Sequence, residues 1–138
     1  MVKKSPTFSL DTMSSTEIVD YLRDNPLFGG VFANDQLKNP DPKKIYVLNL
    51  QNMDEPGSHW VLTWNRCYFD SYGMPPTTAI VPFVDYHNVG NFQGLNQASC
   101  GYYCLYAADQ IMFGRDPYEG LEPGKSEANE RVLKKYFF

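Results

Sequence analysis

The chain has 138 residues, of which 43% are hydrophobic and 15% aromatic, and its formal net charge is −4. This composition is typical of one folded domain with its own core and excludes a disordered chain. The acidic balance gives no general attraction to nucleic acid, and no apolar run approaches the roughly 20 residues needed to cross a membrane.

The three cysteines do not form a disulfide framework, because an odd number leaves at least one thiol outside any pair. A reducing compartment is therefore expected. The segment from Met1 to Pro6 lacks the apolar core of a signal peptide. We expect one domain spanning residues 1–138, in a soluble, intracellular protein that is a monomer.

A short helix is the first predicted element. Residues 1–13 are interpreted as a flexible N-terminal arm, and Ser14 to Glu17 forms a capping-box pattern that opens the helix. Asn25-Pro26 ends it. Its candidate buried positions are Ile18, Val19, Tyr21 and Leu22.

Several strands are predicted next. Residues 28–32 read as a glycine turn, 44–50 as a strand, and 51–57 as a polar loop. Two strands, 59–64 and 67–72, follow, joined at Asn65-Arg66. Residues 80–86 are predicted as a strand despite Pro82.

Two helices complete the pattern, at 100–113 with Gly114 as its stop and at about 127–136. The order of elements predicts an α+β fold, with a central, mainly antiparallel sheet packed against the helix that begins at Cys100.

The register of the two joined strands gives a geometric test. Across a turn at Asn65-Arg66, residues whose numbers sum to 131 face each other, so that His59 faces Tyr72. His59 and Asp70 are then diagonal neighbours on one face, about 7–8 Å apart between backbones. A slip of one residue would place them on opposite faces.

Cys100 is the candidate nucleophile, because a thiol at a helix N-terminus has its thiolate favoured. A buried structural cysteine is the alternative, and the local sequence leaves both open; Cys67 and Cys104 are expected in the core. His59 is the candidate base and Asp70 its orienter, although Asp70 can instead cap a turn.

Gln93 and Gln97 compete for the role of oxyanion donor beside the backbone N–H of Cys100. His87 is expected in a loop. Two histidines and three cysteines lack the spacing of a metal site, so we expect neither metal nor cofactor.

Three segments together resemble the adenovirus-type maturation proteases: Gly57-Ser58-His59-Trp60, residues 68–73 around Asp70, and residues 93–101 around Cys100. These enzymes share a clan with the SUMO-deconjugating proteases. Within this group, the three segments most resemble the maturation proteases of virophages and related large-DNA-virus elements. The resemblance covers roughly residues 15–113.

The resemblance implies a papain-like, adenain-like core with a catalytic set of His59, Asp70, Gln93 and Cys100. It also implies substrate contacts at Trp60, which packs beside the site, and at Gly101. Members of the family cut capsid and core precursors after Gly-Gly or Gly-x, which implies viral structural precursors as substrates. The expected location is the host cytoplasm or viral factory, with packaging in the virion.

Two features differ from the adenovirus enzymes. Those enzymes carry Glu where Asp70 stands here, and Asp70 follows the SUMO-protease pattern. The chain is acidic and short at its C-terminal end, so activation by DNA is not carried over.

The alternatives to a maturation protease are an isopeptidase that removes a ubiquitin-like modifier, an acetyltransferase with a similar triad, and a catalytically silent interaction module. Residues 27–31 also resemble a cleavage site, beside their interpretation as a turn.

Overall fold

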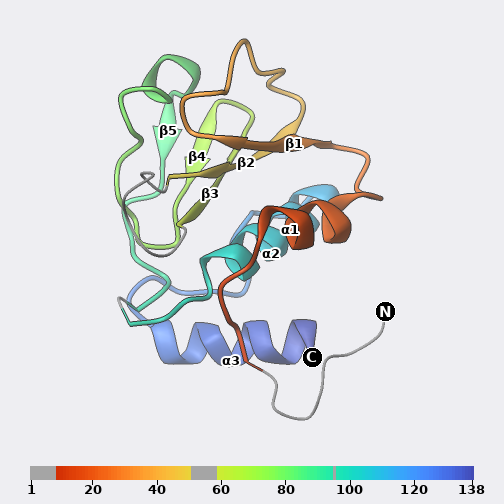
Figure 1. The fold of residues 1–138 in the computed structure, drawn as a ribbon. Helices are drawn as coiled ribbons and strands as arrows, with labels where there is room; N and C mark the ends of the chain where they lie inside the picture. Colours follow the sequence, from red (N-terminus) through yellow and green to blue (C-terminus); the bar gives the residue numbers. More distant parts are fainter. Residues whose placement is uncertain (1–8, 51–58, 95) are drawn as a thin grey trace.

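The computed structural model describes residues 9–50, 59–94 and 96–138, and within them the chain forms a five-stranded sheet and three α-helices. The fold is α+β. Helices α1 (Ser15–Leu22) and α2 (Cys100–Met112) lie under one face of the sheet, and α3 (Ser126–Phe137) lies beyond α2 (Figure 1).

The sheet is mixed, in the order β1-β2-β3-β4-β5. Its strands are β1 (Phe28–Ala33), β2 (Ile45–Asn49), β3 (Trp60–Trp64), β4 (Cys67–Phe69) and β5 (Tyr86–His87). The β2–β3 and β3–β4 pairs are antiparallel, whereas β1–β2 and β4–β5 are parallel. The expected mainly antiparallel sheet is therefore not found. Long connections at 34–44 and 70–85 return the chain to its starting end, which a parallel pair requires.

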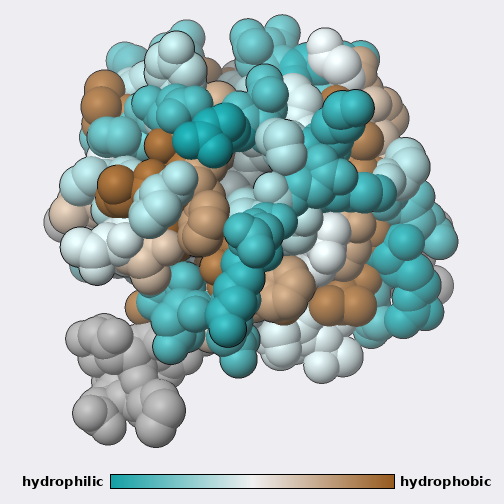
Figure 2. Space-filling model, turned by 90° about the horizontal axis from the view of Figure 1, so that it is seen from above, coloured by the Kyte–Doolittle hydropathy of each residue, from teal (hydrophilic) through white to brown (hydrophobic). Residues whose placement is uncertain are grey.

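The main core lies between the sheet and the helices. Alternation along β2 turns Ile45 and Val47 toward the helices, whereas Leu48 packs into a smaller cluster on the opposite face. That outer cluster also holds Val61 and Tyr68. Seen from the sheet side, hydrophilic side chains cover much of the outer surface, with hydrophobic patches between them (Figure 2).

The first helix follows its sequence signals closely. The capping box is present, because Ser14 accepts from the backbone N–H of Glu17 while the Glu17 side chain accepts from that of Ser14. Ile18 and Leu22 are buried as predicted. Val19 is not, being 38% exposed.

The N-terminal arm is not loose throughout. Leu10 and Met13 are buried in the main core, and Met13 lies against Gly101 of α2. Only residues 9–13 of the predicted arm can be judged, since residues 1–8 lie outside the described part. The predicted loop at 51–57 also lies outside it.

Two predicted elements are wrong. Residues 28–33 form strand β1 instead of a glycine turn, because the chain pairs with β2 through a bulge between Phe28 and Gly30. The predicted strand 80–86 is a 3₁₀ helix (Val81–Phe83) followed by the short β5. Pro82 explains the change, since it lacks the N–H that a strand ladder needs and suits the first turn of a helix.

The last two helices match their predictions to within about a residue. Gly114 follows α2 with a φ of +75°, a conformation that glycine adopts without strain. None of the helices in the described part of the chain has the length and apolar character needed to cross a bilayer.

Candidate active site

A tight hairpin builds one side of the site. Asn65 and Arg66 have φ values of 53° and 60°, the signature of a two-residue type I′ turn between β3 and β4. The pairs Leu62–Phe69 and Thr63–Tyr68 each sum to 131, so the predicted register is confirmed.

This register brings His59 to Asp70. Nε2 of His59 lies 2.7 Å from Oδ1 of Asp70, and the Asp70 side chain is almost fully buried. The backbone N–H of Tyr72 donates to the same oxygen at 2.8 Å. Two donors therefore hold the carboxylate, and the contact leaves Nδ1 of His59 as the nitrogen available to Cys100.

Asn88 fixes the backbone of Asp70. Its Oδ1 accepts from the Asp70 N–H at 2.8 Å, and its Nδ2 donates to the Asp70 carbonyl at 2.6 Å. Sequence reasoning missed this clamp, because Asn88 directly follows His87 in a segment interpreted as a loop. Tyr86 and His87 instead form β5, an exposed edge strand.

Tyr72 covers the histidine. Its ring stacks on His59 with centroids 4.6 Å apart and an interplanar angle of 27°. The register predicted that these two residues face each other, but not that Tyr72 also reaches the loop before Cys100. There its hydroxyl donates to the Gln97 carbonyl at 3.2 Å.

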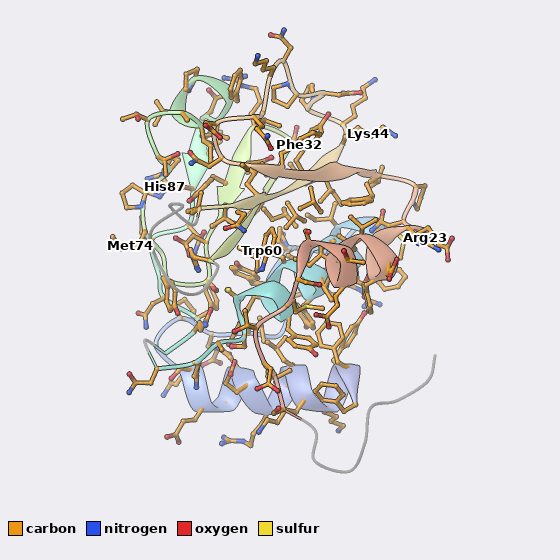
Figure 3. All side chains as sticks on the ribbon, in the orientation of Figure 1. Arg23, Phe32, Lys44, Trp60, Met74 and His87 are labelled. Atoms are coloured by element: carbon orange, nitrogen blue, oxygen red, sulfur yellow. The ribbon has the colours of Figure 1, made fainter. Side chains whose placement is uncertain are left out.

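Cys100 is the first residue of α2, where the helix dipole favours negative charge. The backbone N–H of Trp60 points at its Sγ at a distance of 3.4 Å, which adds a donor for a thiolate. Trp60 lies between the sheet and the start of α2 (Figure 3), and its indole N–H donates to the Met13 carbonyl at 2.9 Å. Cys100 is only 3% exposed.

The electrostatics of the site favour a charged imidazole. Burial lowers the pKa of His59, but its hydrogen bonds and charge interactions with Asp70 and Cys100 outweigh burial and raise the pKa to about 9. An imidazole that stays charged at neutral pH supplies the positive charge beside which a cysteine can act as a nucleophile.

Gln93 is buried, with 1% exposure, in the segment that leads to α2. Its Nε2 donates to the Gln97 carbonyl at 2.6 Å and to the Tyr72 hydroxyl at 3.3 Å. The side chain of Gln97 is used otherwise, since its Oε1 accepts from the Gly94 N–H at 2.7 Å. Of the two candidates for oxyanion donor, Gln93 therefore has its amide nitrogen against Tyr72, the residue that stacks on His59.

Trp60 and Gly101, the predicted substrate contacts, are both buried in this structure. A Cβ on Gly101 would meet the Met13 side chain at 2.9 Å, so close packing already accounts for the glycine. Their contact with a substrate stays a prediction.

The other two cysteines, Cys67 and Cys104, are not candidates for the nucleophile. Cys104 is buried as predicted, and burial raises the pKa of its thiol. Cys67, predicted in the core, is only partly buried, because it sits beside the turn of the hairpin.

No set of three or more potential metal-ligating side chains gathers anywhere in residues 9–50, 59–94 and 96–138. Comparison with protein-family models finds no match, and comparison with curated proteins finds none either. The geometry of Cys100, His59, Asp70 and Gln93 is therefore what the functional argument rests on.

Proposed function

We propose that this chain is a cysteine endopeptidase. The observation that carries the proposal is the 2.7 Å contact between His59 and Asp70, next to a cysteine at a helix N-terminus. A nucleophile, a base held by a third group and an oxyanion donor are the parts that acyl transfer requires.

In the proposed reaction the Cys100 thiolate attacks the scissile carbonyl carbon. A C–S bond forms, and the carbonyl electron pair moves to oxygen, where Gln93 and the Cys100 N–H stabilise it. Collapse breaks the C–N bond, and the His59 imidazolium gives its proton to the leaving amine. Water, deprotonated by His59, then attacks the thioester carbon, and cleavage of the C–S bond releases the acid and returns Cys100 to its thiolate.

The buried thiol has a consequence for this reaction. With Cys100 only 3% exposed, a peptide carbonyl reaches Sγ only after a neighbouring group moves. We assign this movement to Tyr72, which is partly exposed and stacks on His59.

The substrate class comes from the resemblance to adenovirus-type maturation proteases. On that basis the proposed substrates are viral capsid or other structural precursors, cut after Gly-Gly or Gly-x during virion maturation. The proposal includes their papain-like, adenain-like core and a monomer, and activation by DNA is not carried over.

A deconjugating isopeptidase is the second candidate. Asp70 in place of Glu follows the pattern of the SUMO-deconjugating proteases, and their modifiers also end in Gly-Gly. The same residues serve both reactions. A folded modifier joined to lysine, offered beside a short peptide of the same terminal sequence, discriminates the two by the ratio of their kcat/KM values.

The test is hydrolysis of a fluorogenic Leu-x-Gly-Gly peptide under reducing conditions. Wild type should turn over, Cys100→Ala should not, and Cys67→Ala, which removes a partly buried thiol elsewhere, should match wild type. If wild type is silent, a glycine vinyl sulfone is applied. Labelling of Cys100 then indicates a missing activator, and no labelling refutes the endopeptidase in favour of an interaction module.

A further inference from the structure

We infer that Ser71 is a positioning residue, whose hydroxyl fixes the amide of Gln93 with its nitrogen toward the reaction centre. The inference rests on the proposed function, because it assigns Gln93 as the oxyanion donor. Ser71 follows Asp70 directly, so one short segment would orient both the base and the oxyanion donor.

The two side chains meet in a closed environment. Ser71 and Gln93 are each 1% exposed, and the Ser71 hydroxyl donates to Oε1 of Gln93 at 2.6 Å. The backbones of the two segments are also hydrogen-bonded, because the Ser71 carbonyl accepts from the N–H groups of Phe92 and Gln93 at 2.7 and 3.0 Å. Ser71 therefore holds Gln93 by both its backbone and its side chain.

The amide nitrogen of Gln93 donates to two acceptors at different distances. Nε2 donates to the Gln97 carbonyl at 2.6 Å, and a carbonyl only accepts, so this partner requires nitrogen there. The second contact, to the Tyr72 hydroxyl, is longer at 3.3 Å. That weaker contact is the one that a developing oxyanion would replace.

Loss of the Ser71 hydroxyl would leave Oε1 of Gln93 without a donor in a buried site. The donor also polarises the amide and strengthens its N–H groups as donors. Removing an oxyanion donor outright slows catalysis about 100- to 1,000-fold. Weakening one in this way should lower kcat about tenfold, with KM nearly unchanged.

The experiment is a double-mutant cycle with Ser71→Ala and Gln93→Ala, measured as kcat on the Leu-x-Gly-Gly peptide. Ser71→Ala should lower kcat about tenfold in wild type and have almost no effect once Gln93 is alanine. Ser71→Thr, which keeps the hydroxyl, should recover most of the loss. Alkylation of Cys100 by iodoacetamide, which needs no oxyanion donor, should be equal in wild type and Ser71→Ala.

An equal loss of kcat in both backgrounds would reveal a general structural role and overturn the inference, as would no loss at all. A readout independent of turnover separates this result from failure of the proposed function. The side-chain amide signals of Gln93, assigned by their absence in Gln93→Ala, should shift and exchange faster with water in Ser71→Ala. Unchanged amide signals would refute the positioning role even in a protein that cleaves nothing.

Discussion

The imidazole of His59 stacks on the phenol ring of Tyr72, with ring centroids 4.6 Å apart. The same Tyr72 donates its backbone N–H to Asp70 and its hydroxyl to the Gln97 carbonyl. One residue thus contacts the base, its carboxylate and the loop before the nucleophile. An aromatic face over an imidazolium favours the charged form.

The ring and the hydroxyl of Tyr72 can be separated by substitution. Tyr72→Phe keeps the stack and should retain turnover within about threefold of wild type. Tyr72→Leu removes a cation–π contact worth about 1 kcal/mol, so turnover should fall about fivefold. Steady-state kinetics on the glycine peptide check both values. Equal activity of the two variants would show that the ring does not support the imidazolium.

The pH profile of turnover should follow the charge of His59. Its pKa of about 9 means that the imidazolium needed by the leaving amine is lost as the pH rises through about 9. Asp70→Asn removes one of the interactions that raise this pKa. The alkaline limb of kcat should therefore move to lower pH in Asp70→Asn, measured from pH 5 to 10. A limb that stays in place would contradict the assignment.

Folding stability should depend on the same group. The pKa of His59 is raised in the folded protein above its ordinary value of 6.5, so its proton binds more tightly when the chain is folded. The stabilisation is complete below about pH 6.5 and is lost as the pH rises through about 9. Urea unfolding of wild type and His59→Gln should show a stability difference at pH 6 that shrinks by pH 9.5. A difference independent of pH would refute this linkage.

The sequence could predict the hairpin and its register because both depend on a two-residue turn and a period of two. That local geometry was enough to place His59 beside Asp70. The capping box of α1 and the glycine after α2 are equally local signals. The prediction that Val19 is buried is wrong because a short helix buries only a narrow stripe of its surface, which Ile18 and Leu22 already occupy.

The parallel pairs and the finer contacts of the site depend on distant segments. Asn88 reaches Asp70 from 18 residues away, and no local pattern marks a side chain that clamps a backbone. The burial of Cys100 follows from how Trp60 and Met13 pack at the start of α2, a tertiary property. Ser71 lies within residues 68–73, which carry part of the family resemblance, but its contact with Gln93 depends on the tertiary fold.

Gly101 and Met13 offer a test of packing against substrate contact. A Cβ at residue 101 would press on the Met13 side chain, so Gly101→Ala should destabilise the fold by about 1–2 kcal/mol. In a Met13→Ala background the same change should cost almost nothing. Urea unfolding of the four proteins measures this coupling. If the two substitutions lower the free energy of unfolding additively, a clash between residue 101 and Met13 is excluded. A raised KM at unchanged stability would favour a substrate contact for Gly101.

Residues 27–31 resemble a cleavage site of the proposed enzyme, yet they should survive in the folded protein. Gly29 and Gly30 lie in β1, and the Leu27 carbonyl accepts from the Ile45 N–H at 2.8 Å.

A protease binds its substrate as a free extended chain, and this segment is already paired with β2. After long incubation, mass spectrometry should find intact wild type, indistinguishable from Cys100→Ala. A synthetic peptide of residues 25–34 should be cut after Gly30 under the same conditions, because it lacks the sheet. A fragment that ends at Gly30 in wild type and is absent from Cys100→Ala would show that β1 opens often enough to be processed.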